Sequence, residues 1–211
     1  MSYPIHVNLA GRRCVVVGAG RVAERRVMGL LREGALVRLV APQATAALSV
    51  LADAGKLTWA RAPYASAHID DAFLVIAATD QRAINAAAAR DCAERNILCC
   101  NAGDPDSGSF TTPGVVERGP LVLTVSTSGV SPTLSAWIKG RLDEQFGPEW
   151  AAWTTLFGEI RHLVQRQAGE AARLEAVERV LASARVRERI SAGDEAGALE
   201  EAQRCISPSP V

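Results

Sequence analysis

The hexapeptide GAGRVA, residues 18–23, has the residue types and the spacing of a phosphate-binding loop. In the pattern G-x-G-x-x-A the first glycine makes a tight turn, and the second lets the backbone approach a pyrophosphate. The small third residue allows a strand and a helix to pack closely, and the N-terminus of that helix favours negative charge. An apolar run precedes the loop and a helical pattern follows it, as this motif requires, although a tight turn without a ligand is the alternative. We predict a dinucleotide site that includes Gly18, Gly20, Arg21 and Val22.

Two further stretches follow apolar runs and would reach the same edge of a parallel sheet, where ligands of this architecture bind. Residues 40–43 read Val-Ala-Pro-Gln and lack the acidic residue that commonly holds the ribose of NAD. We predict that Pro42 and Gln43 contact the cofactor, but the residues leave NAD and NADP open, because Gln43 does not repel a 2′-phosphate. Thr79 and Asp80 are predicted to contact the cofactor, to cap the next helix, or both.

The elements that must position these residues alternate between strand and helix patterns. Strands are predicted at 13–17, 36–41, 57–60, 73–78 and 97–100, and helices at 22–32, 44–54 and 82–95. This alternation indicates right-handed βαβ units and a Rossmann-type parallel sheet.

The pattern changes after residue 101. Short β runs at 114–117 and 121–126 flank Arg-Gly-Pro and predict a hairpin or a tight crossing. Ser131-Pro132 opens a helix with a hydroxyl cap and a first-turn proline, the chain beyond 148 is helical in pattern, and its tail is expected to fray. We therefore predict an α/β fold with a Rossmann domain at 1–112, a small β/α segment at 113–147 and a helical domain at 148–211.

Composition narrows the possible partners. The 211 residues carry 23 basic and 23 acidic side chains, which argues against a general nucleic-acid binder. The five cysteines form no CxxC pair and no Cys/His cluster at zinc spacing, so we predict no metal site. No apolar run matches a signal peptide or a membrane span, and we expect a cytoplasmic protein without a membrane partner.

Several segments resemble the precorrin-2 dehydrogenase/sirohydrochlorin ferrochelatase family, the N-terminal module of siroheme synthase. They are GAGRVAERR, VAP, VIAATD, an N-x-x-D ahead of Ser-Phe, and RGPLVLTVSTSGVSPTLS. The most specific piece is STSGVSP at 126–132, because few other Rossmann proteins place such a segment after the fifth strand. The resemblance covers roughly the first 145 residues well.

The resemblance implies an enzyme. Members of the family oxidise precorrin-2 to sirohydrochlorin and pass a hydride to NAD, and many also insert ferrous iron to give siroheme. Iron would then be a substrate, held by the nitrogens of the tetrapyrrole. Members are also homodimers, which implies that the segment 113–147 forms the interface between two copies.

The resemblance assigns the general base of both reactions to an aspartate in the loop after the fifth strand. Counted forward from Asn101 this residue is Asp104, whereas counted back from Ser109 the position falls on Gly103, because the loop is one residue shorter than usual. We predict Asp104 as the catalytic residue and Asp106 as the reserve. Turn formation is the alternative role of Asp-Pro-Asp.

A substrate with eight carboxylates, as the resemblance implies, requires hydrogen-bond donors and positive charge. The predicted substrate-binding residues are Asn101, Arg118, Ser126, Thr127, Ser128 and Ser131. Alternatively, the Ser/Thr run is a polar strand end with a helix cap, and Arg118 lies in a solvated turn.

Two other functions stay open from the sequence. The first is a dehydrogenase without chelatase activity, an alternative that the shortened aspartate loop raises and that the sequence does not separate from the bifunctional enzyme. The second is a nucleotide-sensing Rossmann module that does no chemistry, against which the STSGVSP segment argues.

Overall fold

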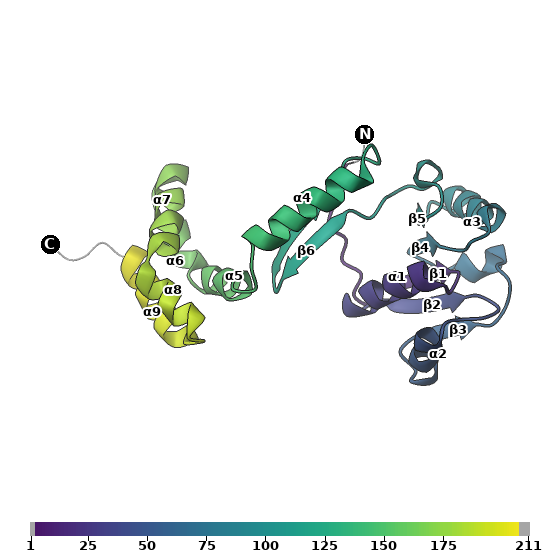
Figure 1. The fold of residues 1–211 in the computed structure, drawn as a ribbon, viewed down its shortest axis with the longest axis horizontal. Coiled ribbons are helices and arrows are strands. Elements are labelled where there is room, and N and C mark those ends of the chain that lie inside the picture. The colour runs from purple at the N-terminus through teal and green to yellow at the C-terminus, as the bar shows by residue number, and fades with distance from the viewer. Residues whose placement is uncertain (1–2, 207–211) are drawn as a thin grey trace. The chain divides into compact units, whose positions relative to one another are not determined.

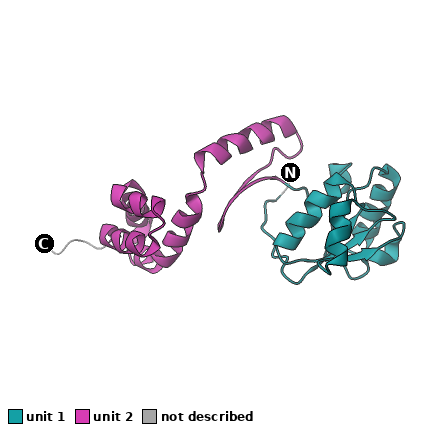
Figure 2. Cartoon of the chain, turned by 60° about the horizontal axis from the view of Figure 1, so that its bottom comes forward, with its two compact units in different colours: residues 1–112 teal, residues 113–211 magenta. Residues whose placement is uncertain are grey.

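The computed structural model describes residues 3–206 (Figure 1). The described chain divides into two compact units at Thr112 (Figure 2). The first unit contains a parallel sheet with helices, and the second contains a hairpin followed by helices. The expected fraying concerns residues 207–211, which lie outside the described part.

The sheet of the first unit has five parallel strands in the order β3-β2-β1-β4-β5. They are β1 (Arg13–Val17), β2 (Leu36–Val40), β3 (Thr58–Ala60), β4 (Leu74–Ala77) and β5 (Leu98–Asn101). The central strand β1 is buried on both faces, which explains its uninterrupted apolar run. The strand order reverses between β1 and β4, and ligands of such sheets bind outside the carboxyl ends of the strands at this switch point.

Helices cover both faces of this sheet (Figure 1). α1 (Arg21–Arg32) and α2 (Ala46–Asp53) pack on one face, where Val27 and Leu48 are fully buried. α3 (Arg82–Glu94) and the short 3-10 helix η1 (Ser66–Ile69) pack on the other face. A second 3-10 turn, η2 (Pro105–Ser107), follows β5.

The second unit begins with an antiparallel hairpin of β6 (Gly114–Arg118) and β7 (Leu121–Val125), against which α4 (Pro132–Gln145) packs. Up to residue 206, where the described part ends, five helices follow: α5 (Trp150–Glu159), α6 (Arg161–Gln165), α7 (Gly169–Ala182), α8 (Ala184–Ser191) and α9 (Glu195–Ile206). Their apolar faces form a separate core around Trp153, Ile160 and Val180.

The predicted fold class is confirmed: a Rossmann-type parallel sheet is followed by a small β/α segment and by helices. The ends of the predicted elements of the sheet domain differ by at most two residues. The largest difference is at α2, which begins at Ala46 because the Thr45 hydroxyl accepts a hydrogen bond from the Leu48 N–H at 3.4 Å and makes Thr45 the N-cap.

The hairpin and the helix cap of the second unit also match the prediction. The turn between β6 and β7 contains Gly119 with φ +57°, a left-handed conformation that favours glycine. Ser131 is the N-cap of α4, since its hydroxyl accepts from the Leu134 N–H at 3.2 Å, and Pro132 is the first helical residue.

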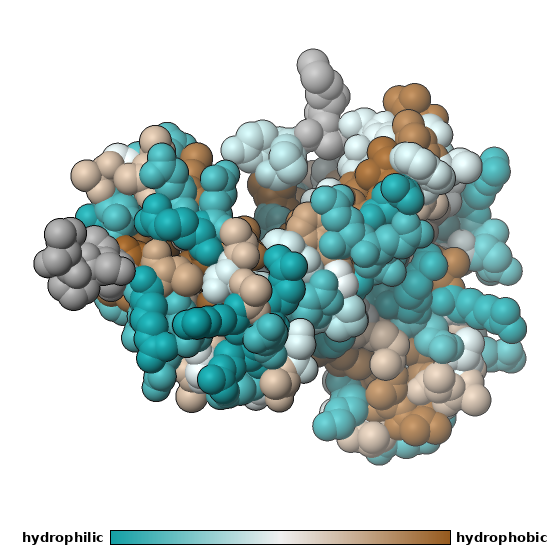
Figure 3. All heavy atoms as spheres, turned by 60° about the vertical axis from the view of Figure 1, so that its left-hand side comes forward, coloured by the Kyte–Doolittle hydropathy of each residue, from teal (hydrophilic) through white to brown (hydrophobic). Residues whose placement is uncertain are grey.

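The surface carries mixed side chains (Figure 3). Hydrophilic groups cover much of the face shown, with apolar groups scattered among them. None of the helices in residues 3–206 is both long and apolar enough to cross a bilayer.

Candidate active site at the carboxyl edge of the sheet

The glycine loop joins β1 to α1, and its first glycine is required by close backbone contacts. Gly18 has φ +101°, and a Cβ there would lie 2.6 Å from the carbonyl oxygen of Ala78 and 2.9 Å from the Thr79 nitrogen. Its N–H donates to the Val40 carbonyl at 2.9 Å. The turn is therefore pressed against the end of β4, and any side chain would separate the two strands.

The second glycine faces open space. Gly20 is the N-cap of α1, makes no side-chain capping bond, and would carry a Cβ with nothing within 4 Å. Arg21 and Val22 are exposed in the first turn of the helix. Backbone N–H groups at such a helix start attract anions, and the missing side chain leaves room for a phosphate, so this loop fits a dinucleotide.

The loop between β2 and α2 is held beside the glycine loop. The Thr45 N–H donates to the Ala19 carbonyl at 3.3 Å, and the Thr45 hydroxyl donates to the Glu24 carboxylate at 2.6 Å. Pro42 and Gln43 lie in this loop and are exposed. The structure thus brings the predicted phosphate-binding and ribose-binding residues to one edge of the sheet.

Thr79 follows β4 and is clamped by a buried asparagine. Its N–H and its hydroxyl both donate to Asn85 Oδ1, at 3.0 and 2.7 Å, and its carbonyl accepts from Asn85 Nδ2 at 3.0 Å. The N-cap of α3 is Gln81, whose N–H donates to the Thr79 hydroxyl at 3.1 Å. Thr79 therefore organises the start of α3 from two residues before the cap, and Asp80 is exposed beside it.

Asp104 lies in the loop after β5 and is exposed, while its backbone is fixed at both ends. Asn101 Oδ1 accepts from the N–H groups of Gly103 and Asp104 at 3.0 and 3.2 Å. The Asp104 carbonyl accepts from the Ser107 hydroxyl at 3.0 Å, and Asn101 Nδ2 donates to that same hydroxyl at 2.8 Å. Asn101 is 3% exposed, so the amide predicted to meet substrate is engaged within the loop. Asp106, the reserve, is exposed in η2.

The Ser/Thr loop of the second unit, residues 126–131, is bonded largely to itself. The Thr127 hydroxyl donates to the Ser131 carbonyl at 3.0 Å, accepts from the Ser131 N–H at 3.1 Å and lies 2.9 Å from the Ser135 hydroxyl. The Ser126 hydroxyl accepts from the Ser128 N–H at 3.1 Å. Ser126 and Ser131 keep their own O–H as a donor, and Ser128 is exposed with φ +51°.

Arg118 lies at the turn end of the hairpin, whereas the Ser/Thr loop follows the opposite end of β7. Its Nε donates to the Phe146 carbonyl at 2.7 Å, and its Nη2 donates to the carbonyl and to the carboxylate of Asp143 at 3.1 and 2.9 Å. The guanidinium thus caps the end of α4. The structure does not bring Arg118 together with residues 126–131.

Known proteins resemble both the sequence and the fold. The family model described as "Putative NAD(P)-binding" matches residues 5–114. The chain belongs to this NAD(P)-binding family.

Siroheme synthases match this chain beyond the residues of the family model. The enzyme of Nitrosococcus oceani is 35% identical over 207 residues, which cover 96% of this chain and 44% of that protein. Siroheme synthase 1 of Serratia proteamaculans is 39% identical over 144 residues, 68% of this chain and 30% of that protein. The chain therefore spans less than half the length of these relatives.

A solved structure matches nearly the whole chain. SirC, a precorrin-2 dehydrogenase, superposes with a TM-score of 0.74 at 26% identity, over 96% of this chain and 100% of that one. Together with the siroheme synthase relatives, this match confirms the resemblance predicted from STSGVSP and the other segments.

In this NAD(P)-binding family member the sheet edge gathers Gly18, Thr79 and Asp104 from the ends of three neighbouring strands, β1, β4 and β5. Sequence reasoning missed Asn85, Thr45 and Ser107, which hold these loops. Asn85 could have been noticed in the sequence, because it is the lone polar residue in the alanine-rich stretch 83–89. In the structure it is only 2% exposed.

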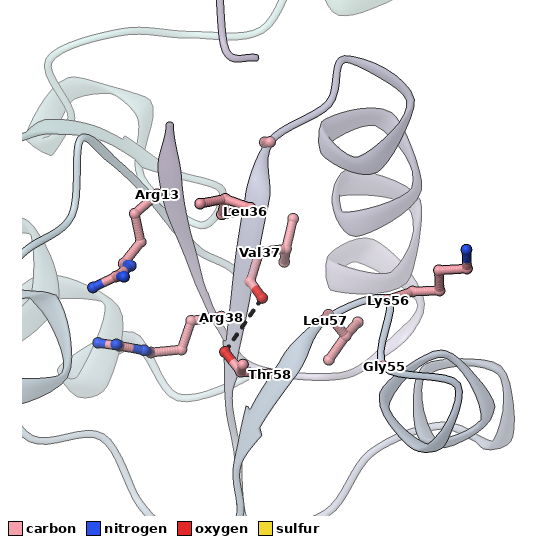
Figure 4. Close-up of a pocket in the computed structure, with 9 residues that line it drawn as sticks. Arg13, Leu36, Val37, Arg38, Gly55, Lys56, Leu57 and Thr58 are labelled. Carbon is pink, nitrogen blue, oxygen red and sulfur yellow. Dashed lines mark hydrogen bonds between the residues drawn. The ribbon is translucent and has the colours of Figure 1, made fainter. Parts of the chain in front are cut away.

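One cavity lies apart from this edge. A cavity of about 260 Å³ lies at the amino ends of β1, β2 and β3 (Figure 4). Arg13 and Arg38 at its rim both pair with the Asp71 carboxylate. Their charge is thus partly neutralised within the protein, and the cavity is remote from the switch point.

The buried thiols of Cys14 and Cys100 supply no further chemistry. Burial raises the pKa of the Cys14 thiol to about 11 and also raises the pKa of Cys100. Both thiols stay protonated at neutral pH and are poor nucleophiles. Across residues 3–206, no group of three or more His, Cys, Asp and Glu side chains could hold a metal ion.

Proposed function

We propose that the protein oxidises precorrin-2 to sirohydrochlorin with NAD as the hydride acceptor. The observation that carries this proposal is the position of Asp104, at the same sheet edge as the glycine loop and two strands away from it. Strands lie about 4.8 Å apart, so the two loops begin about 10 Å apart, a span that a nicotinamide and the edge of a tetrapyrrole can fill. The siroheme synthase relatives and SirC support the choice of substrate.

The oxidation removes a hydride and a proton from the substrate. When bound, oxidised NAD supplies the acceptor for the hydride. The Asp104 carboxylate accepts the proton as general base, and its backbone bonds to Asn101 and Ser107 keep it in place. The first turn of α1 binds the pyrophosphate, and Pro42, Gln43, Thr79 and Asp80 line the rest of the cofactor.

The substrate carboxylates are assigned to donors that the structure leaves available. Ser126, Ser128 and Ser131 keep an O–H group, whereas Thr127, Asn101 and Arg118 hold the protein itself together. We propose contacts from the three serines and assign the predicted roles of the other residues to structural support.

Insertion of ferrous iron is proposed as a second activity of the same site, because the relatives are named for siroheme synthesis. Asp104 would accept the pyrrole N–H protons as the metal enters. Anaerobic incubation of sirohydrochlorin with Fe²⁺ and no nucleotide tests this activity. Insertion no faster than the spontaneous rate would leave a dehydrogenase alone.

A homodimer is proposed through the segment 113–147. Val130, Leu134 and Trp137 are apolar and exposed there, with 87%, 48% and 64% of their surface accessible. Analytical sedimentation tests this assembly. The wild type should sediment as a dimer, and Trp137→Glu should shift toward the monomer. The proposed setting of the enzyme is the cytoplasm.

The deciding experiment compares the wild type with Asp104→Asn and Asp106→Asn in precorrin-2 oxidation. Asp104→Asn keeps the shape but cannot accept a proton, so kcat should fall about 100- to 10,000-fold while the Kd of NAD is unchanged. Asp106→Asn, the matched control, should retain turnover. Equal turnover by Asp104→Asn would remove the catalytic assignment, and NAD binding without any wild-type turnover would favour a sensing module.

A further inference from the structure

We propose that two buried asparagines, Asn85 and Asn101, are positioning residues. Together they hold the loop after β4, which lies against the glycine loop, at a fixed distance from the Asp104 loop. This inference rests on the proposed function and extends it to residues that touch neither substrate nor cofactor. Among the described residues these two are the buried polar side chains, with exposed fractions of 2% and 3%. A buried amide is costly unless its hydrogen bonds are made, so each is expected to serve a defined bonding pattern.

Asn101 fixes the loop that carries the general base. As the last residue of β5 it is anchored in the sheet, and its Oδ1 accepts the two successive N–H groups of Gly103 and Asp104. Its Nδ2 reaches Ser107, whose hydroxyl in turn holds the Asp104 carbonyl. One amide thus controls both polar ends of the Asp104 backbone while the carboxylate stays exposed.

Asn85 fixes the loop after β4, which lies against the glycine loop. It lies in the first turn of α3, and its amide forms three hydrogen bonds with Thr79 alone. Thr79 in turn lies against the glycine turn, where its nitrogen is 2.9 Å from the Cβ position of Gly18. Asn85 therefore determines where the end of β4 contacts the glycine loop.

The two asparagines meet at Gly103. A Cβ at Gly103 would lie 3.4 Å from Asn85 Nδ2 and 3.6 Å from Asn101 Oδ1. The Asn85 amide thus borders the side-chain position that Gly103 leaves empty, while Asn101 Oδ1 accepts from the Gly103 N–H. Strands β4 and β5 are paired up to Ala77 and Asn101, and the Ala102 N–H donates to the Ala77 carbonyl at 2.9 Å, so the two loops leave adjacent points of the sheet.

This arrangement links the distance between Asp104 and the cofactor to the integrity of the asparagine pair. A displacement of about 1 Å at a reacting group can lower the rate about 100-fold even when binding is retained. Loss of either amide should therefore reduce kcat more than it weakens substrate binding. Loss of both should cost less than the product of the single effects, because both act on one junction.

The test uses steady-state oxidation of precorrin-2 by the full chain, with Kd of NAD and thermal midpoints measured in parallel. Asn101→Ala should lower kcat about 10- to 100-fold with the Kd of NAD within about twofold. Asn101→Asp keeps an oxygen for both N–H groups and should restore most of kcat at its pH plateau. Asn85→Ala should lower kcat and also weaken NAD, whereas Asn8→Ala, at an exposed asparagine, should change neither.

Ser107→Ala covers the case in which a variant at a buried asparagine does not fold. It removes one exposed hydroxyl of the same network, and an intermediate loss of kcat is expected. If all folded variants keep wild-type kcat, or if Asn101→Asp is no better than Asn101→Ala, the positioning role is overturned. Absence of turnover in the wild type would instead overturn the proposed function and this inference with it.

Discussion

The glycine loop of the first unit and the Ser/Thr loop of the second unit both follow a strand and precede a helix. Apart from Arg21, the glycine loop at 18–22 has no side-chain donors, and its helix start has no side-chain cap and open space around Gly20. The loop at 126–131 is rich in hydroxyl groups, and these bond mostly within the loop and to the start of α4.

The difference shows that the number of hydroxyl side chains in a loop does not tell how many hydrogen-bond donors a ligand can reach. A hydroxyl near a helix start satisfies N–H groups that would otherwise attract an anion. Glycine leaves those groups free. Substitutions at Gly18, Gly20, Arg118 and Thr127 test this difference between the two loops.

The largest effect is expected for Gly18→Ala. The added Cβ meets backbone atoms of Ala78 at 2.6 and 2.8 Å in a left-handed conformation, so the free energy of unfolding should fall by about 3 kcal/mol or more. Denaturant unfolding measures this loss. The control Gly29→Ala, in the interior of α1 with nothing within 4 Å of its Cβ position, should be stabilised by about 0.5–1 kcal/mol. Equal stability of the two variants would contradict the packed-turn interpretation.

Gly20→Asp should separate binding from folding. An aspartate is a good N-cap, so stability should hold, but its bulk and charge occupy the phosphate position and should raise the Kd of NAD about tenfold or more. Titration calorimetry measures the affinity. Gly20→Asn is the matched control for charge, and it should bind NAD more tightly than the aspartate variant. Unchanged affinity in both variants would exclude Gly20 from the cofactor site.

Arg118→Ala tests the second unit. Loss of the bonds to Phe146 and Asp143 should lower the free energy of unfolding by about 1–3 kcal/mol, because carbonyls at the end of α4 lose their partner. Arg141→Ala removes an exposed ion pair on the same helix and should cost about 0–1 kcal/mol. NAD affinity should be unchanged in both. A rise in the KM for precorrin-2 without a loss of stability would instead support the predicted role of Arg118 in substrate binding.

The smallest effects are expected within the Ser/Thr loop. Thr127→Val removes bonds to Ser131 and Ser135 and should cost about 1 kcal/mol of stability. Ser128→Ala should change stability by less than about 0.5 kcal/mol and raise the KM for precorrin-2. The opposite pattern, with Thr127 affecting KM and Ser128 affecting folding, would reverse the division between structural and substrate-binding hydroxyls.

The sheet and its loops could be predicted from sequence because they depend on local signals. Apolar runs such as residues 14–17 mark buried parallel strands, and the glycine spacing marks the turn that follows. The supporting bonds could not be predicted in the same way. Arg118 reaches a carbonyl 28 residues away, and Asn85 and Gly103 meet only because β4 and β5 are neighbours. Such partners are chosen by the tertiary fold, and one sequence does not display them.

The hairpin and α4 should unfold locally more easily than the parallel sheet does. Over residues 113–147 the one fully buried side chain is Val116, and a two-stranded hairpin is only marginally stable in water. Local opening of this stretch should therefore need less free energy than opening of β1, whose four last residues are all buried. Amide hydrogen exchange in α4 thus becomes a sensitive reporter, since any surface that covers the helix would slow it while exchange in β1 stays constant.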